Sequence, residues 1–182
     1  HPGAQEQLDC SRALERLKPW LEDRTRAKVV HDAKFAMHLF ANHGLALAGA
    51  LDDTLLQSYV LESHRNHELA SLAERHLNRT LARHEALVGK GVGRIGFDEV
   101  DIAGAGAYAA QAARVIFALH GAPSPGIPAD PRLSYIYGSI EIPVSVVLFA
   151  MERHGVLLDA ALLEAHGVTL RGRMAAIEQQ AH

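Results

Sequence analysis

Lys28–Leu61, KVVHDAKFAMHLFANHGLALAGALDDTLLQSYVL, is the stretch of the chain that decides its fold. At its start, Ala27–His31 is a short apolar run of the length of one buried strand. Apolar residues at helical spacing follow and end at Asn42-His43-Gly44, a pattern typical of a helix C-terminus. A second apolar run, Leu45–Leu51, predicts a second strand. The stretch therefore predicts a strand–helix–strand unit of the α/β class.

Asp53 follows this second run, at the start of another predicted helix. An acidic side chain at such a position either caps free backbone N–H groups or holds a metal ion just past a strand end. We favour the capping role. Because polar residues gather at the carboxyl edge of an α/β sheet, this edge is where we expect a functional site.

The composition narrows the class of protein. The chain has 182 residues, a formal charge of −3 and one cysteine, Cys10, which has no partner for an internal disulfide. These features are typical of an intracellular protein with one domain, or with one domain and an appendage, and they argue against a strongly basic surface over the whole molecule. The first residues lack a signal-peptide pattern, and we expect no apolar run long enough to cross a bilayer. Because the chain starts at His1 and not at a methionine, we expect it to be a piece of a longer protein.

The rest of the chain is predicted to be mostly helical. Ser11 is a candidate N-cap for a helix that runs to Glu22, and Pro19 predicts a kink or an early end in it. Further helices are predicted over residues 68–78, 83–88, 98–100, 104–120, 133–154 and 159–182. A kink is predicted at Pro143, and the proline-rich stretch Gly121–Pro131 is the predicted linker.

Five motifs, in order, resemble those of bacterial DNA polymerase I, a family A polymerase. They are Lys34-Phe35 with Ala41-Asn42-His43-Gly44, Asp53-Thr54 with Ser58-Tyr59, His67–Arg75, Tyr108–Ala112, and Ile140–Pro143 with Met151–Val156. The resemblance implies a ribonuclease H-like 3′–5′ exonuclease fold that is helix-rich and truncated at its N-terminus, followed by polymerase-domain helices. It implies an exonuclease-like domain over residues 1–121, a linker over 122–131 and the first polymerase helices over 132–182.

The resemblance also implies that the exonuclease site is degenerate. In the family, carboxylates hold two divalent metal ions that assist phosphodiester hydrolysis. The aspartate of the second motif is here Ala36 and that of the third is Ala112, and a methyl group cannot bind a metal. Tyr108, which orients the attacking water in the family, remains, as does Asp53. We therefore expect no catalytic residue, metal or cofactor in this chain, and Mg²⁺ only for its parent polymerase.

Neighbouring positions have changed as well. Arg114, Ala70 and Gln111 stand where the family commonly has acids. An arginine beside a metal site repels cations, so these changes favour natural decay of the site over an engineered substitution. For Tyr108, a packed side chain with a hydrogen-bonded hydroxyl is the favoured interpretation.

Candidate nucleic-acid contacts are Lys34, Lys90, Arg94 and Arg171. Lys90 and Arg94 lie in a glycine-rich loop that is not a phosphate-binding loop, because no Lys-Ser/Thr pair follows at the required spacing. Arg171 fits a solvated helix face better. The twelve histidines allow a zinc site among His64, His67, His76 and His84, but solvated histidines are the favoured interpretation.

We therefore expect a fragment of DNA polymerase I whose exonuclease-like domain is inactive and acts as a scaffold with weak affinity for nucleic acid. The parent would be a cytoplasmic bacterial DNA-directed DNA polymerase of replication and repair, with DNA as its partner and no membrane contact. One alternative is an active metal-dependent 3′–5′ exonuclease that uses Asp32, Asp52 or Asp53, and another is a helical module unrelated to DNA. Because the missing first strands lie mid-sheet in the family, we expect exposed strand edges that a preceding segment or a second copy covers.

Overall fold

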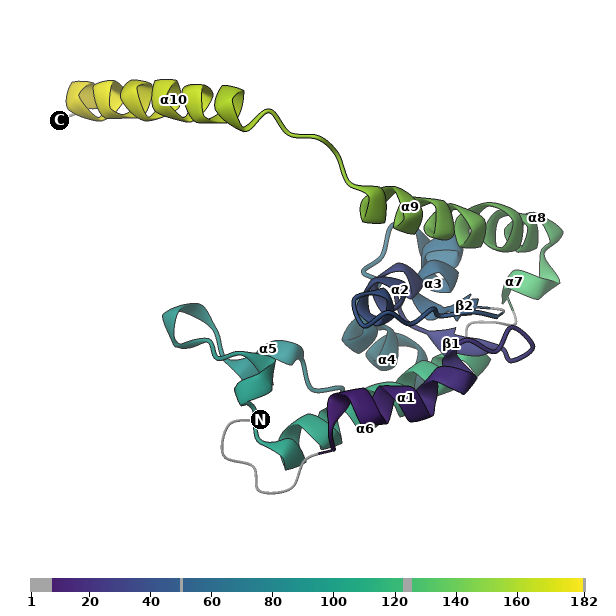
Figure 1. Ribbon diagram of the computed structural model, residues 1–182. Helices are drawn as coiled ribbons and strands as arrows, with labels where there is room; N and C mark the ends of the chain where they lie inside the picture. Colours follow the sequence, from purple (N-terminus) through teal and green to yellow (C-terminus); the bar gives the residue numbers. More distant parts are fainter. Residues whose placement is uncertain (1–7, 50, 123–125, 182) are drawn as a thin grey trace. The chain divides into compact units, whose positions relative to one another are not determined.

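The computed structural model describes residues 8–49, 51–122 and 126–181 (Figure 1). The chain divides into two compact units, His1–Ala150 and Met151–His182. The first unit holds both strands and the hydrophobic core. The second holds the end of helix α9 (Ile142–His154) and all of α10 (Ala160–Ala181), whose first turn Asp159 caps, as predicted, through Leu162 N at 2.9 Å.

The strand–helix–strand unit predicted from the sequence is confirmed. β1 (Lys28–Val30) and β2 (Leu51–Asp53) pair in parallel, with Lys28 opposite Leu51 and Val30 opposite Asp53. Helix α2 (Ala33–Ala41) lies between them in the chain (Figure 1). Within the described residues this sheet has two strands, so each strand has one unpaired edge.

The second strand lies further along the chain than predicted. Residues 45–48 form a loop because their backbone groups have other partners: Ala48 N donates to Leu21 O at 2.9 Å, and Lys28 Nζ donates to Ala48 O at 2.6 Å. Gly49 then turns the chain with φ +98°, where a Cβ would lie 2.4 Å from Arg26 O, so the position requires glycine. Residues 45–48 of the apolar run are thus a partly buried loop, whereas Leu51 belongs to β2.

Lys28 is an unusual buried cation at the start of β1. Its side chain is 3% exposed, and besides Ala48 O its ammonium group donates to Asp23 O at 2.8 Å and Arg26 O at 3.1 Å. All three ammonium N–H groups therefore have a carbonyl partner, which offsets the cost of burying the charge.

Helix α1 (Cys10–Leu21) begins earlier than predicted. Its N-cap is Asp9 and not Ser11, because the Asp9 carboxylate accepts from Arg12 N at 2.8 Å. Pro19 lies inside the helix, which continues to Leu21.

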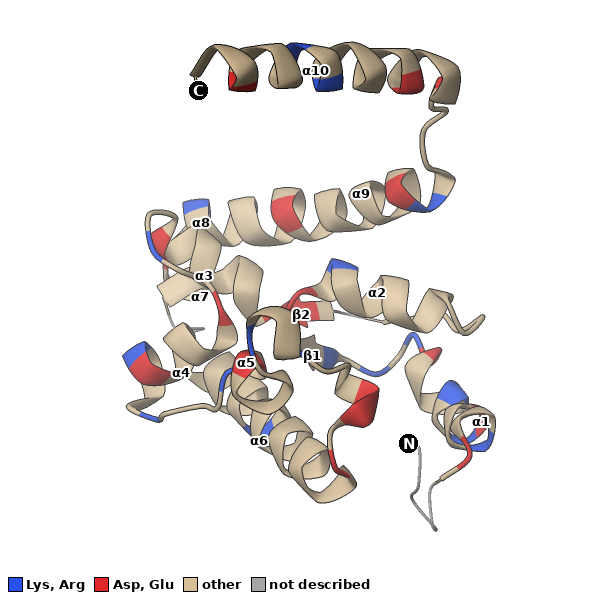
Figure 2. Cartoon of the chain, turned by 90° about the vertical axis from the view of Figure 1, so that its left-hand side faces the viewer, with Lys and Arg blue, Asp and Glu red and all other residues tan. Residues whose placement is uncertain are grey.

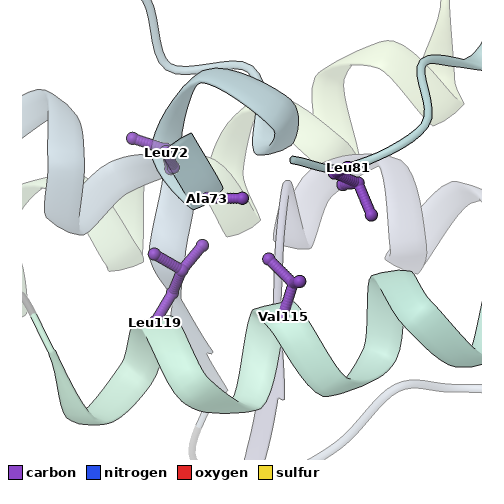
Figure 3. Close-up of a cluster of buried hydrophobic side chains, with 5 residues drawn as sticks. All are labelled: Leu72, Ala73, Leu81, Val115 and Leu119. Atoms are coloured by element: carbon purple, nitrogen blue, oxygen red, sulfur yellow. The ribbon is translucent and has the colours of Figure 1, made fainter. Parts of the chain in front are cut away.

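The core of the first unit lies between α4 and α6. The helices of this part are α3 (Thr54–Glu62), α4 (Leu69–Leu77), α5 (His84–Val88) and α6 (Ile102–Gly121), with short 3₁₀ turns at Gly91–Gly93 and Phe97–Glu99. The buried side chains are Leu72, Ala73, Leu81, Val115 and Leu119 (Figure 3). Helix α6 begins two residues before its predicted start because Asp101 caps it through Gly104 N at 2.7 Å.

After α6 the chain continues through α7 (Gly126–Ala129), α8 (Pro131–Tyr135), a π-helical turn η3 (Ile136–Glu141) and α9. The predicted linker thus contains a short helix, in which Ile127 is buried, while its residues 123–125 lie outside the described residues. The π turn precedes Pro143, which has no N–H to donate to the carbonyl four residues earlier. The domain boundaries given by the resemblance, 1–121, 122–131 and 132–182, stay predictions.

Two segments are long and apolar enough to cross a membrane by length and composition, contrary to the expectation from the sequence. They are Ile102–Ala129, which includes residues outside the described ranges, and Pro131–His154. The charged residues of the second segment are Arg132, Glu141, Glu152 and Arg153, and the rest of α9 is tan in Figure 2. Core helices of soluble proteins pass the same test, and the absence of membrane contact stays a prediction.

Candidate functional site

The carboxyl ends of β1 and β2 meet at one edge of the sheet, because the two strands are parallel. His31 and Asp32 follow β1, and Thr54 follows β2, which ends at Asp53. The polar residues that the sequence placed at this edge are therefore brought together by the fold.

Asp53 is a buried helix cap, 2% exposed. Its carboxylate accepts from Leu55 N at 2.9 Å in the first turn of α3, and from Asp32 N at 3.0 Å and Ala33 N at 2.7 Å at the start of α2. One side chain thus binds N–H groups at the N-termini of two helices. Asp32 in turn caps α2 through Phe35 N at 3.0 Å, with its own backbone at φ 67°.

His31 has polar partners in Thr54 and in the backbone of His67. Its Nδ1 lies 2.9 Å from Thr54 Oγ1, and the Thr54 hydroxyl donates to Val30 O at 3.2 Å. The His67 backbone also forms a hydrogen bond with His31. Burial lowers the pKa of His31 from its ordinary value, and the carboxylates of Asp53 and Asp32 oppose this shift.

The lowered pKa of His31 predicts a loss of stability in mild acid. The unfolded chain takes up a proton on His31 below its ordinary pKa of about 6.5, whereas the folded chain resists it, so the free energy of unfolding falls as the pH drops. Urea unfolding between pH 7.5 and 5.5 measures this. His31→Gln should reduce the slope, and His64→Gln, at an exposed position, should keep it. An unchanged slope in His31→Gln would contradict the assignment.

Asp52, which precedes the helix cap Asp53, contacts side chains from three elements. Gln57 Nε2 on α3 and the Tyr137 hydroxyl on η3 both donate to Asp52 Oδ1, and His120 Nδ1 at the end of α6 lies 2.7 Å from Asp52 Oδ2. The Tyr137 oxygen also accepts from Asp53 N at 2.8 Å. Sequence reasoning did not find Tyr137 or His120, since no motif links residues that far apart in the chain.

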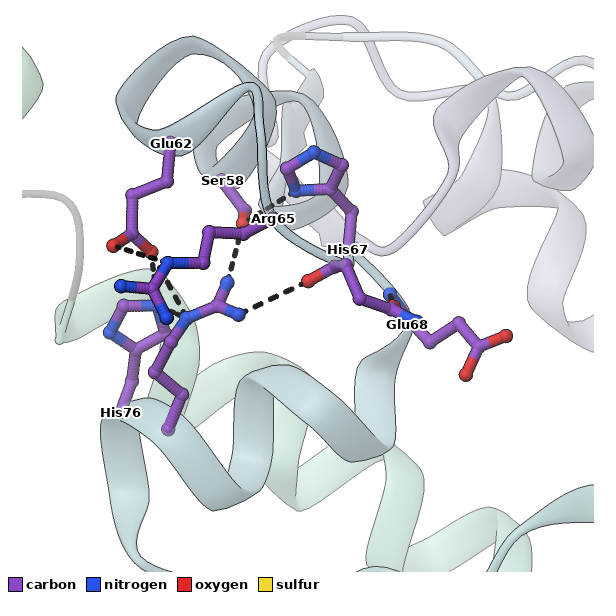
Figure 4. Close-up of polar contacts among 8 residues, drawn as sticks. Ser58, Glu62, Arg65, His67, Glu68 and His76 are labelled. Atoms are coloured by element: carbon purple, nitrogen blue, oxygen red, sulfur yellow. Dashed lines mark hydrogen bonds and ion pairs between the residues drawn. The ribbon is translucent and has the colours of Figure 1, made fainter.

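A second polar cluster joins α3 to α4 (Figure 4). Arg75 Nε lies 3.0 Å from Glu62 Oε2, and Arg75 Nη2 donates to Ser58 Oγ at 3.2 Å. Ser58 is 1% exposed and pairs with the half-buried His67 through Nδ1 at 2.9 Å, so the serine is a structural partner and not an accessible nucleophile. His76 Nε2 lies 3.7 Å from Glu62 Oε2, and burial together with the Arg75 charge lowers the pKa of His76.

The histidines considered for zinc are His64, His67, His76 and His84, and within the described residues they do not gather into a metal site. Within residues 8–49, 51–122 and 126–181, no three His, Cys, Asp or Glu side chains are arranged to hold a metal ion. The absence of a metal in this chain stays a prediction.

The positions implied by the exonuclease resemblance lie on two helices. Ala36 is on α2, and Ala112 and Tyr108 are on α6. The Tyr108 ring lies 6.2 Å from that of Phe97 and 6.4 Å from that of His84, and those two rings stack at 5.7 Å. Tyr108 is thus packed in an aromatic cluster. The hydrogen bond expected for its hydroxyl stays a prediction.

The candidate nucleic-acid contacts are dispersed. Lys90 and Arg94 flank the turn Gly91–Gly93, and Lys90 Nζ pairs with Glu85 Oε2 at 2.7 Å, which lowers the pKa of Glu85. Lys34 is on α2 of the first unit, and Arg171 is an exposed residue of α10 in the second. Lys90 and Arg94 both lie near Glu85.

Residues 6–119 match the family model described as DNA polymerase I, ribonuclease H-like domain. The chain belongs to this family. The resemblance that the motifs indicated is therefore confirmed, and so is the ribonuclease H-like fold class.

Curated members of the DNA polymerase I family are similar over nearly the whole chain. The DNA polymerase I of Pseudomonas aeruginosa is 40% identical over 183 residues, which cover 99% of this chain and 20% of that protein. The DNA polymerase I of Rhizobium leguminosarum is 34% identical over 161 residues, which cover 88% of this chain and 16% of that protein. The chain thus spans about a fifth or less of the length of these relatives.

A solved structure of the same kind supports the fold. It is the POL domain of Pol1 from M. smegmatis in complex with DNA primer-template and dNTP, matched with a TM-score of 0.65 and 26% identity. The match covers 88% of this chain and 24% of that chain. This chain is therefore a DNA polymerase I fragment with an exonuclease domain.

Proposed function

We propose that the exonuclease-like domain of this chain does not hydrolyse DNA and serves as a scaffold beside the polymerase domain of its parent. The observation that carries the proposal is the lack of a side-chain oxygen at both Ala36 and Ala112. Two-metal hydrolysis needs carboxylate oxygens that bridge and position the ions, and a methyl group supplies none.

The acidic residues at the sheet edge already have polar partners within the protein. The Asp53 carboxylate accepts three backbone N–H groups, and Asp32 caps α2. Asp52 binds Tyr137, Gln57 and His120. A metal ion at any of these carboxylates must displace existing partners, which argues against the alternative of an active exonuclease built on Asp32, Asp52 or Asp53.

The parent enzyme is proposed to catalyse template-directed nucleotide transfer in bacterial replication and repair, with Mg²⁺ as its metal and the cytoplasm as its location. This rests on the similarity to DNA polymerase I proteins and to a polymerase solved with primer-template DNA. Within the chain, Lys90 and Arg94 offer at most a small cationic contact for nucleic acid, because Glu85 neutralises Lys90.

A manganese titration tests the loss of the metal site. Calorimetry of the chain with Mn²⁺ should show no site tighter than about 1 mM, because isolated surface carboxylates bind divalent ions only weakly. Asp32→Asn, Asp52→Asn and Asp53→Asn serve as matched variants. Micromolar binding that one of these variants removes would support the active exonuclease instead.

A further inference from the structure

Asp52 connects parts of the chain that are far apart in sequence. It lies on β2 and contacts Gln57 on α3, His120 at the end of α6 and Tyr137 on η3. We call these four residues the Asp52 cluster. Tyr137 and Asp52 are separated by 85 positions.

The direction of each hydrogen bond at Tyr137 is fixed. Asp53 N–H donates to the Tyr137 oxygen at 2.8 Å, and the single hydroxyl hydrogen is therefore directed at Asp52 Oδ1. Burial and the neighbouring Asp52 carboxylate raise the pKa of Tyr137, so the hydroxyl stays protonated and remains a donor at neutral pH. A neutral hydroxyl that donates to a carboxylate forms one of the stronger hydrogen bonds in proteins.

Other contacts also join this segment to the rest of the first unit, because α7 and η3 both pack against α3. The segment is residues 126–150, and two of the four prolines of Gly121–Pro131, Pro128 and Pro131, lie within it. Its apolar contacts include buried Ile127 and an edge-to-face contact of Phe149 with His38 at 4.8 Å. Outward-facing residues such as Val144 and Val147 are exposed and do not help to hold it.

We propose that the Asp52 cluster is a polar latch that holds residues 126–150, the start of the polymerase-side helices, on the exonuclease-like sheet. The proposal deepens the scaffold role and rests on it: the domain keeps the polymerase helices in place through Asp52, a side chain that hydrolysis does not require. The latch closes when Tyr137 donates to Asp52 and opens when that bond is lost.

Hydrogen exchange measured by mass spectrometry tests the latch in the intact chain. Tyr137→Phe removes the hydroxyl that donates to Asp52 and accepts from Asp53 N. Peptides from residues 131–150 should then exchange about tenfold or more faster, as expected for the loss of a charge-assisted hydrogen bond. Peptides from α4 should keep their exchange rates. Tyr135→Phe is the matched control, because Tyr135 is 62% exposed and lies two residues away, and it should change nothing.

A second variant tests whether Asp52 is the hydrogen-bond partner of Tyr137. Asp52→Ala, which removes the acceptor oxygen, should accelerate the same peptides, and the double variant should be no faster than Tyr137→Phe alone, because both changes remove the Tyr137–Asp52 hydrogen bond. Unchanged exchange in Tyr137→Phe, or equal acceleration in α4, would overturn the latch. An active exonuclease would be detected in a separate experiment, as metal-dependent shortening of DNA. That result would contradict the proposed function and would not change these exchange rates.

Discussion

Replacing Leu119 by alanine is expected to lower the free energy of unfolding by about 2–5 kcal/mol. Leu119 is fully buried on α6, where it packs against Leu72, Ala73, Leu81 and Val115 (Figure 3). Truncation removes the transfer energy of the buried methyl groups and leaves a cavity between α4 and α6. Since small domains are stable by only about 5–15 kcal/mol, the loss should be large relative to the total.

Urea denaturation followed by circular dichroism measures this loss. Phe117→Ala is the control on the same helix, because Phe117 is 73% exposed and its truncation should change stability by about 0.5 kcal/mol or less. Equal losses in the two variants would contradict the placement of the core between α4 and α6.

Asp53→Ala is expected to cost about 3–5 kcal/mol, because it leaves backbone N–H groups at the starts of both α2 and α3 without a partner. An unpaired buried donor loses its hydrogen bond and regains no water. The effect should therefore exceed that of an ordinary helix cap.

Asp101→Ala provides the matched comparison. Asp101 is an exposed N-cap that binds only Gly104 N, at 2.7 Å, and its loss should cost about 1 kcal/mol. Denaturant midpoints of the two variants, compared at one pH, give the difference. If Asp53→Ala were no worse than Asp101→Ala, Asp53 would not be the double cap described above.

The sequence predicted those helices, strands and caps that depend on residues close together in the chain. The valines of β1, the helical spacing of α2, the Asp53 cap and the glycine after α2 were all visible in Lys28–Leu61, and each is confirmed. The second strand was misplaced for a tertiary reason. Lys28 and Leu21 form hydrogen bonds with the backbone of the apolar run, although both residues lie outside that run in the sequence.

The candidate site was harder to predict because its partners come from distant segments. Asp52 has a local neighbour in Gln57, but its contacts to His120 and Tyr137 depend on how α6 and η3 pack on the sheet. Likewise, Ser58 and Arg75 meet only after α3 and α4 pack. By contrast, the missing carboxylates at Ala36 and Ala112 were identified from the family resemblance alone, because this requires only the identity of the residue at each position.

The most direct test of the proposed loss of exonuclease activity is the digestion of 5′-labelled single-stranded DNA by this chain and by its parent polymerase, in Mg²⁺ or Mn²⁺. A family member that carries aspartates at both degenerate positions is the positive control. We predict that the labelled strand keeps its length, as in a reaction without protein. Progressive shortening from the 3′ end that requires the metal and is abolished by Asp52→Asn or Asp53→Asn would contradict the account.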